Sequence, residues 1–596
     1  MSGTPPAPPG PRTGDPRTSR RSRGVRAALA ALAVATLVLL GLLPPAQQAA
    51  AASYVPISGA GSTWSQNALD QWRANVKQYG MTVNYNGTGS SDGRNQFRNG
   101  TVDYGVSEIP YGVKDSGVVD SPPSRKYAYM PIVAGGTSFM YNLRIGNQRV
   151  TNLRLSGPVI AKIFTGGITL WNDPAIKADN PGLAASLPAR RIVPVVRSDG
   201  SGTTAQLTAW MAKEHGSVWD DYCAKAGRST PCGTTSNYPL VPGKGFVAQS
   251  GSNGVSGYVA QAGNIGTITY VEYSYAVYTT GFPVAKVLNK AGYYTEPTAQ
   301  NVAVSLLDAR INDNSSSPQY LTQILDGVYS NKRNDARNYP LSSYSYMVVP
   351  TKLESNFNAQ KGKTLGAFSY YFLCQGQQHV DNLGYSPLPV NLVEAGLDQV
   401  RKIPGVDVEN VNIKNCRNPT FSEDGTNTLA KTAPMPPACD KQGATQCTTG
   451  TGGDKKPTVP QGGSAGAGSG SGGGTGGGTA SGGGSTGGAG TGGTGGAAAS
   501  GGAGATGGSA SPGASADGGT AIDPDTGQPL GAGGTGDAAG AGAGGGDAFA
   551  VPVSTSGALG GSARIVLTVL AGLLLVVVTV GPPLLSRLLT ARKSGS

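Results

Sequence analysis

Apolar and polar residues follow two alternating patterns between residues 54 and about 415. In TWSQNALDQWRANVKQY, Trp64, Ala68, Trp72 and Val76 lie four residues apart, which predicts one apolar stripe of a helix. RIVPVV and TITYVEYSYAVY are rich in β-branched and aromatic residues and predict strands, whereas TTAQLTAWMAKE predicts another helix. Because such segments alternate over about 360 residues, the pattern predicts an α/β fold with two lobes.

A longer apolar run lies near each end of the chain. At the N-terminal end, arginines precede RAALAALAVATLVLLGLLPPAQQAAAAS, in which an apolar run leads into small residues. This order is typical of a secretory signal, so we predict a signal peptide over residues 1–52 that leaves Ser53 as the first mature residue. Arg20 and Arg21 leave a twin-arginine signal open as an alternative.

The C-terminal run is long enough to cross a membrane. RIVLTVLAGLLLVVVTVGPPLL holds about 20 apolar residues, which is the length that spans a bilayer core. We predict a transmembrane helix over residues 563–586. Arg587, Arg592 and Lys593 follow it, so the positive-inside rule places residues 587–596 in the cytoplasm as a short basic tail.

Composition changes sharply before that helix. The chain has 93 glycines, and they crowd into residues 448–548 among serine, threonine and alanine. Such a stretch has almost no large apolar side chains, so burial cannot offset the entropy of ordering it. We predict that residues 448–562 are a flexible linker between a folded domain, residues 53–447, and the membrane.

The six cysteines fit an oxidising compartment outside the cytoplasm. Neighbours in sequence are the expected disulfide partners, although other pairings are open. The pairs are Cys223 with Cys232, Cys374 with Cys416, and Cys439 with Cys447. No Cys/His spacing of a zinc site occurs, so no metal or other cofactor is predicted.

Net charge adds one weak constraint. The formal charge is +12, yet the basic residues gather partly in the signal and the tail, and no Lys/Arg block interrupts the middle. We therefore predict no nucleic-acid partner. A mildly basic domain suits anionic ligands in general.

Candidate chemistry lies where a predicted strand meets a helix, in VVRSDGSGTT at residues 195–204. The first amides of a helix lack intrahelical partners and lie at the positive end of the helix dipole, so they attract anions. Glycines let the backbone approach a ligand, hydroxyls add donors, and an arginine can grip an oxyanion with two N–H groups. The residues concerned are Arg197, Asp199, Ser201, Gly202 and Thr203. An ordinary Ser/Thr helix cap is the alternative.

Two further stretches have the same character. SGAGSTW, residues 58–64, leads into the first predicted helix, and NGTGSSDGRNQF, residues 86–97, sets Ser90 and Ser91 between glycines. Each alone could be a cap or a turn. Three such junctions in one α/β domain exceed what capping needs, and converging helix N-termini would form a cage for an oxyanion.

These segments together resemble a known family. GAGSTW, YNGTGSSDGRNQF, TVDYGVSEIPY, GGITLWNDPAI, VVRSDGSGTT and GSNGVSGYVAQAGNIGTITYVEYSYA occur in the order found in the phosphate-binding protein of the bacterial high-affinity phosphate ABC transporter. The likeness spans about 57–276 and continues more weakly to about 415. It implies a type II periplasmic-binding-protein fold in which two lobes close on one phosphate. Lobe one would comprise about 54–133 and 345–415, and lobe two about 134–340.

The resemblance also implies a phosphate site. The residues that it places there are Thr63, Trp64, Ser90, Glu108, Arg197, Asp199, Ser201, Gly202 and Thr203. Amides and hydroxyls would hold the anion, Arg197 would pair with it, and Asp199 would orient the arginine. Where the family usually has Asp, this chain has Glu108, which is one methylene longer. Such a carboxylate accepts a proton of phosphate and repels fully ionised sulfate.

The function that the resemblance implies is that of a secreted, membrane-tethered binding protein rather than an enzyme. Its partners would be inorganic phosphate, the permease subunits of an ABC transporter, and the membrane through the C-terminal helix. A surface phosphate sensor or adhesin with the same fold is the alternative. A phosphohydrolase is disfavoured, because the chain has only two histidines, His215 and His379, as possible catalytic bases. KGKTLG, residues 361–366, resembles the end of a P-loop, but Phe357 occupies the position of the first glycine of that motif.

Overall fold

The computed structural model describes residue 3 and residues 54–115, 118–354 and 356–458. The predicted transmembrane helix and cytoplasmic tail lie outside the described residues, as do almost all of the signal peptide and the linker beyond residue 458. Within the described ranges, no helix is both long and apolar enough to cross a membrane.

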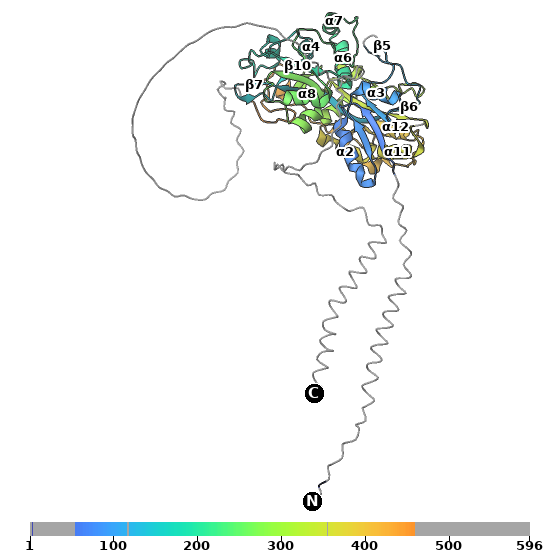
Figure 1. The fold of residues 1–596 in the computed structure, drawn as a ribbon. Coiled ribbons are helices and arrows are strands. Elements are labelled where there is room, and N and C mark those ends of the chain that lie inside the picture. The colour runs from blue at the N-terminus through green and yellow to red at the C-terminus, as the bar shows by residue number, and fades with distance from the viewer. Residues whose placement is uncertain (1–2, 4–53, 116–117, 355, 459–596) are drawn as a thin grey trace, which may run out of the picture. The chain divides into compact units, whose positions relative to one another are not determined.

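One mixed sheet runs through both lobes (Figure 1). Its main path has the order β2 (Val83–Asn86), β1 (Ile57–Gly61), β3 (Tyr104–Ser107), β17 (Ser342–Pro350), β6 (Tyr127–Asn142), β12 (Thr267–Glu272), β10 (Val193–Arg197) and β11 (Val247–Gln249). The three strands at each end of this order pair in parallel, whereas β6 and β17 pair antiparallel in the middle. The predicted α/β fold is therefore confirmed, with one parallel set of strands in each lobe.

The strand β6 carries the chain from lobe one into lobe two. Its first part, as far as Gly136, pairs with β17, and its second part, from Thr137, pairs with β12. The chain returns near Leu341, whose carbonyl accepts a hydrogen bond from the Thr137 amide at 3.0 Å. The two crossing points thus lie beside each other, and we refer to them as the hinge.

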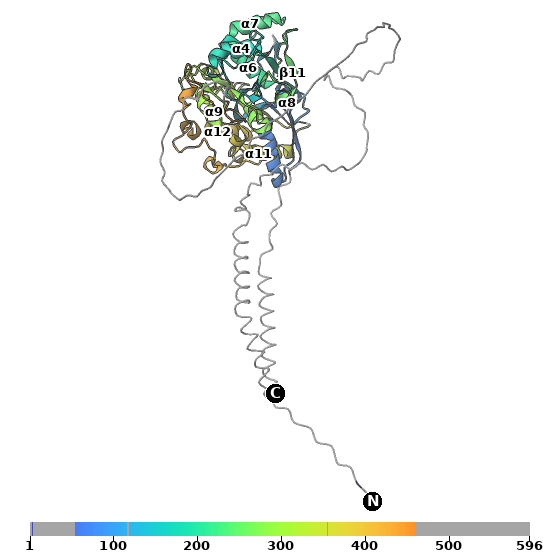
Figure 2. The same cartoon turned by 90° about the vertical axis from the view of Figure 1, so that its left-hand side faces the viewer.

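Helices pack around the sheet (Figure 1 and Figure 2). The helices of lobe one are α2 (Gln66–Val76), α3 (Ser90–Arg98), α11 (Ala359–Leu373) and α12 (Val390–Val400). Those of lobe two are α4 (Gly157–Phe164), α5 (Pro174–Asp179), α6 (Gly202–Glu214), α7 (Gly216–Lys225), α8 (Gly251–Ala260) and α10 (Asp326–Ser330). The helix α9 (Ala299–Leu306) packs against the middle strands β6 and β17, and its Val302 and Leu306 belong to the core of lobe one. Each lobe has its own apolar core, in which Trp72 and Phe368 are buried in lobe one, and Trp171 and Trp219 in lobe two.

Short elements complete the two lobes. Paired strands are β4 (Lys114–Asp115), β5 (Val118–Val119), β7 (Arg144–Ile145), β8 (Gln148–Arg149), β9 (Arg154–Leu155), β13 (Val284–Leu288), β14 (Tyr294–Thr295), β15 (Arg310–Ile311) and β16 (Gln323–Ile324). Single turns of helix are η1 (Lys77–Tyr79), η2 (Tyr275–Thr280), η3 (Gln375–Gln377), η4 (Val380–Leu383), η5 (Ile413–Cys416), α13 (Thr428–Lys431) and η6 (Ala438–Asp440).

Two predicted elements have different bounds in the structure. The first helix begins at Gln66, so Trp64 precedes it in the loop after β1, although its side chain is fully buried as the apolar stripe required. The predicted strand TITYVEYSYAVY ends at Glu272 and gives way to a π-helical turn, η2. Periodicity alone could not locate that change, because Tyr270 of β12 and Tyr275 of η2 are both buried.

The chain crosses between the lobes a third time after α12. Cys374–Cys416 ties its start to lobe one, and Cys439–Cys447 lies where it reaches lobe two, together with an ion pair of 2.5 Å between Asp440 and Lys286. Residues 448–458 also lie against lobe two, where the Thr451 amide donates to the Thr151 carbonyl at 3.0 Å. The described fold therefore continues past residue 447, where we predicted the linker to begin.

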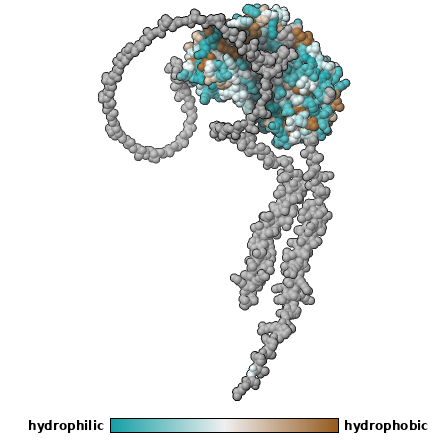
Figure 3. Space-filling view, in the orientation of Figure 1, coloured by the Kyte–Doolittle hydropathy of each residue, from teal (hydrophilic) through white to brown (hydrophobic). Residues whose placement is uncertain are grey.

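All three predicted disulfides are present, since Cys223–Cys232 joins the other two. The surface shown in Figure 3 is mostly hydrophilic, with scattered apolar patches. Exposed large apolar residues such as Val118, Leu353 and Met435 are far apart in sequence. Scattered residues of this kind are normal for a domain in water.

Candidate anion-binding site

Four strand-to-helix junctions meet in the cleft between the lobes. In lobe one, β1 leads to α2 and β2 leads to α3, and in lobe two, β10 leads to α6 and β11 leads to α8. The carboxyl ends of parallel strands in an open α/β sheet form its usual ligand crevice. Each helix start adds amides that have no intrahelical partner. Three of these junctions were predicted as candidates from the sequence, and the β11–α8 junction was not.

We refer to the polar residues that gather at these junctions as the cleft cluster. Its members are Ser62, Thr63, Ser90, Glu108, Arg197, Asp199, Gly202, Ser252 and Ser345. All of these residues except Asp199 are buried.

The carboxyl group of Glu108 lies at the centre of the lobe-one side. Ser62 Oγ and Ser345 Oγ donate to its Oε1 at 2.6 and 2.7 Å, and Ser90 Oγ donates to its Oε2 at 2.8 Å. Burial raises the pKa of Glu108, and the three hydroxyl donors act in the opposite direction by stabilising the carboxylate. The alternative that Glu108 is a solvated surface acid is excluded by its exposed fraction of 2%.

Arg197 has the matching position on the lobe-two side. Its Nε donates to Asp199 Oδ1 at 2.7 Å and its Nη2 pairs with Asp199 Oδ2, which fixes the plane of the guanidinium. Burial works to raise the pKa of Asp199, but the hydrogen bonds and the charge of Arg197 outweigh it and hold that pKa below its usual value. The remaining nitrogen, Nη1, points to Ser252 Oγ at 3.4 Å.

Direct contacts join the two halves of the cluster. Thr63 Oγ1 and Ser252 Oγ lie 2.8 Å apart, and the Ser252 amide donates to Thr63 Oγ1 at 3.1 Å. The Gly202 amide donates to Ser90 Oγ at 3.1 Å. Donors from both lobes therefore reach common points, as a site that closes around a small ligand requires.

Two glycines are needed for this close approach. Gly89 has a positive φ of 97°, and a Cβ there would lie 2.6 Å from Asp199 Oδ2. A Cβ on Gly202 would overlap Glu108 Oε2 and lie 2.5 Å from Ser90 Oγ. Any larger residue at either position would push the lobes apart.

The remaining predicted residues lie at the same junctions with different contacts. Ser201 caps α6, because its Oγ accepts a hydrogen bond from the Thr204 amide at 3.2 Å. The Trp64 amide donates to Ser62 Oγ at 2.9 Å. Thr203 Oγ1 is buried and has no hydrogen-bond partner among the described residues. A buried hydroxyl without a partner is costly, so Thr203 Oγ1 is a candidate donor to a ligand at the start of α6.

Sequence reasoning missed three members of the cluster, Ser62, Ser252 and Ser345. Ser252 follows a Ser-Gly pair at the end of β11, so the same strand–glycine–hydroxyl pattern could have revealed it. Ser345 lies inside β17, far from Glu108 in sequence, and has no local signal.

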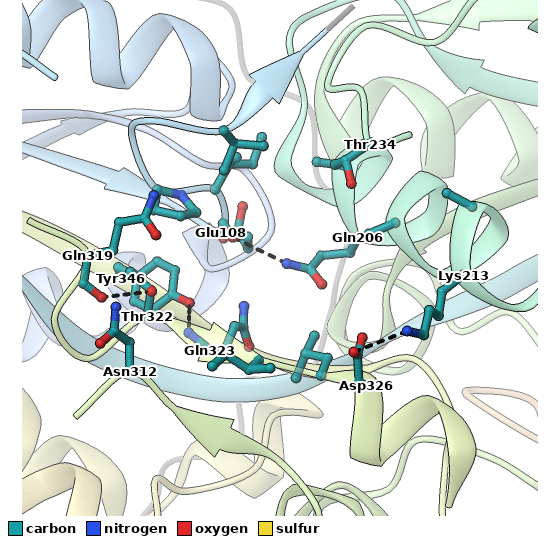
Figure 4. A pocket seen from close by; sticks show the side chains of 18 of the residues that line it. Glu108, Gln206, Lys213, Thr234, Asn312, Gln319, Thr322, Gln323, Asp326 and Tyr346 are labelled. Atoms are coloured by element: carbon teal, nitrogen blue, oxygen red, sulfur yellow. Dashed lines mark hydrogen bonds and ion pairs between the residues drawn. The ribbon is translucent and has the colours of Figure 1, made fainter. Parts of the chain in front are cut away.

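A cavity of about 560 Å³ opens next to Glu108 (Figure 4). Residues 108–113 of lobe one, α6 of lobe two and residues between 312 and 329 line it, and Gln206 on its wall donates to the Glu108 carbonyl at 3.2 Å. Of the cleft cluster, Glu108 lines it, whereas Thr63, Ser90 and Arg197 do not. The cavity therefore adjoins the cleft cluster at Glu108.

The structure offers little support for other chemistry. Among the residues that it describes, no group of three His, Cys, Asp or Glu side chains is placed to hold a metal ion. His215 lies against Trp210 with a ring separation of 4.7 Å, and burial lowers its pKa to about 4. It belongs to neither half of the cleft cluster.

The unpartnered hydroxyl gives the first prediction. Thr203→Val should weaken binding of an oxyanion by about 1–2 kcal/mol and leave stability unchanged or slightly higher, because a buried donor with no partner in the protein is removed. Thr208→Val is the matched control on the same helix, since Thr208 Oγ1 donates to the Thr235 carbonyl at 2.9 Å. We expect the control to lose stability and keep its affinity. Titration calorimetry and thermal unfolding of both variants test this, and equal affinities for Thr203→Val and the unmodified protein would contradict it.

Comparison with known proteins gives the family. The model of the PBP superfamily domain matches residues 45–375. The phosphate-binding protein PstS of Xylella fastidiosa is 32% identical over 354 residues, which cover 59% of this chain and 85% of that protein. The chain belongs to this family of phosphate-binding proteins. The PstS protein of Methanocaldococcus jannaschii is 30% identical over 370 residues, with 59% and 87% covered.

Membership of the family confirms the resemblance seen in the sequence and the periplasmic-binding-protein-like fold. The family consists of binding proteins, so the prediction that the chain is not an enzyme is also confirmed. Among solved structures, the ancestral soluble variant of the human phosphate binding protein aligns with a TM-score of 0.44 and 18% identity, covering 61% of this chain and 99% of that one.

Proposed function

We propose that this protein captures inorganic phosphate between its two lobes, outside the cytoplasm, and delivers it to the permease subunits of an ABC transporter. The observation that carries the proposal is the cleft cluster, in which four helix N-termini, Arg197 and Glu108 meet in one buried place. The relatives named phosphate-binding proteins support the choice of anion.

Phosphate would be held without bulk water. Burying an anion is unfavourable unless fixed donors replace its hydration shell. The helix-terminal amides of α3, that of Ser90 included, and of α6, the hydroxyls of Thr63 and Thr203, and Nη1 of Arg197 are the donors available, since the Ser90 hydroxyl already donates to Glu108. Because Thr63 contacts Ser252 and Ser90 contacts Gly202 directly, the lobes must open to admit the ligand and close again on it.

Glu108 would select phosphate over sulfate. Its carboxylate can accept a hydrogen bond from a protonated oxygen of phosphate, whereas sulfate at neutral pH has no proton to donate and would face the carboxylate with a lone pair. Asp199 would remain bonded to Arg197 and keep the guanidinium oriented toward the ligand.

Titration calorimetry of residues 53–458 against phosphate, arsenate and sulfate tests the proposal. We expect one phosphate to bind per chain, arsenate to bind in the same site because its shape and protonation are similar, and sulfate to bind much more weakly. Equal affinity for sulfate would contradict the role of Glu108, and no binding of phosphate would contradict the proposed function.

A surface phosphate sensor or adhesin is the second candidate, because the same binding site would serve it. The two are distinguished in cells. Deleting the coding region should abolish high-affinity phosphate uptake if the protein feeds a permease. Loss of signalling or attachment with normal uptake would favour the alternative.

Location gives a further prediction. Three disulfides support an oxidising compartment, and the composition of residues 459–562 favours an unstructured tether that a protease can cut. Protease added to intact cells should therefore release a soluble fragment that still binds phosphate. Immunoblots of supernatant and cells provide the measurement, and full-length protein that survives such treatment would contradict a secreted and tethered arrangement.

A further inference from the structure

A second buried carboxyl group lies behind the cleft cluster. Glu272 is the last residue of β12 and its exposed fraction is 0%. Its Oε2 accepts a hydrogen bond from the Ser274 amide at 2.6 Å, whereas its Oε1 is buried and has no hydrogen-bond partner in the described part of the chain. The anion site described above does not use this group.

The carboxyl group of Glu272 lies against the hinge and against the loop that carries Thr63 and Trp64. A Cβ built on Gly135, in the hinge part of β6, would lie 2.9 Å from Glu272 Oε1 and 2.8 Å from the Trp64 ring. Two tyrosines around it hold that loop from behind. Tyr385 donates to the Trp64 carbonyl at 2.6 Å, and Tyr275 donates to the Thr63 carbonyl at 2.5 Å.

Glu272 forms no ion pair among the described residues, and the cation on the neighbouring strand β10, Arg197, is paired with Asp199. The groups that act most on the charge of Glu272 are the amides of Tyr273 and Ser274, the hydroxyl of Tyr385 and the carboxyl of Glu108, which repels it. The next acid is Glu296, which accepts a hydrogen bond from Tyr273 at 3.1 Å and is itself paired with Lys455. Burial, with the repulsion from Glu108 added, raises the pKa of Glu272 well above its usual value. A buried carboxyl without a cation keeps its proton.

We propose that Glu272 is a positioning residue that must hold its proton for phosphate to bind, an inference that rests on the function proposed above. In the neutral form it fills the space behind Trp64 and adds no charge. When it loses the proton, a second negative charge appears beside Glu108 and behind the loop that binds the anion. The affinity for phosphate is therefore highest while Glu272 is protonated, and it declines as pH rises through the raised pKa of Glu272.

The test compares binding of inorganic phosphate to the purified protein and to Glu272→Gln, which keeps the size and removes the titration. At about pH 6 the two should bind within roughly twofold of each other, and as pH is raised through the pKa of Glu272 the unmodified protein should come to bind roughly tenfold more weakly than the variant. The ratio of the two Kd values cancels the ionisation of phosphate and of Glu108, which both proteins share. Glu296→Gln is the control, because that acid has a cation partner, and its ratio to the unmodified protein should not change with pH.

A second measurement does not depend on phosphate. The infrared difference spectrum between the unmodified protein and Glu272→Gln at neutral pH should contain the carbonyl band of a protonated carboxyl group, recorded without any ligand. Absence of that band, or a Kd ratio that stays constant with pH, overturns the inference. If neither protein binds phosphate at any pH while the band is present, the proposed function fails and so does the link to binding, although the proton on Glu272 stands.

Discussion

Arg197→Ala should weaken phosphate binding by about 3 kcal/mol or more, which exceeds a hundredfold increase in Kd. Arg197 is the cation of the cleft cluster, and its exposed fraction is 3%, so solvent screens it little. The substitution also leaves the carboxylate of Asp199 without its partner at the mouth of the site, where it would repel an incoming anion. The loss of the cation and the repulsion by Asp199 both lower the affinity for phosphate.

A second variant separates the two contributions. Arg197→Ala combined with Asp199→Asn removes the cation and the stranded charge together, and we expect it to recover part of the lost affinity. Arg401→Ala serves as the surface control, because Arg401 forms an exposed ion pair with Asp398 three residues away. Titration calorimetry of the three variants gives the comparison. A folded Arg197→Ala protein with unchanged affinity would place the anion site elsewhere.

The general position of the site could be predicted from local sequence. A run of apolar residues that ends in glycines, serines and threonines indicates a strand that turns into a helix, and three of the four junctions in the cleft carry that pattern. The pattern says nothing about convergence, which depends on the strand order β2-β1-β3 in one lobe and β12-β10-β11 in the other. The convergence of the junctions was predicted from the family resemblance and not from the pattern of residues.

Contacts between distant segments account for what could not be predicted. Ser345 donates to Glu108 from the middle of a buried strand, and nothing in SSYSYMVVP distinguishes it from the two serines before it. Contacts between distant segments also determine where the fold ends, in residues 448–458. Thr451 lies among glycines that look like linker, yet its Oγ1 donates to the Thr151 carbonyl at 2.9 Å and is fully buried. Only the fold of lobe two reveals that partner.

The substitution Glu108→Gln should narrow the preference for phosphate over sulfate by about tenfold or more. The structure indicates that the amide fits, because its carbonyl oxygen can accept the hydroxyls of Ser62 and Ser345, and its amino group can donate to Ser90 Oγ. The fold of the cleft should therefore survive the change. What disappears is the negative charge that sulfate meets when it enters.

Phosphate and sulfate respond differently to that change. Phosphate loses the acceptor for its proton and gains relief from repulsion, so its own affinity moves little or falls, whereas sulfate only gains. The quantity to measure is the ratio of the two Kd values, at one pH and low salt, since salt screens the repulsion. Glu394→Gln, an exposed acid on α12, is the control and should leave the ratio unchanged.

Glu108→Asp separates the charge of the side chain from its length. It keeps the charge and withdraws the carboxylate by one methylene from Ser90 and Gly202. The preference for phosphate over sulfate should be preserved if the charge determines it. An unchanged ratio in Glu108→Gln would mean that this carboxylate does not face the ligand.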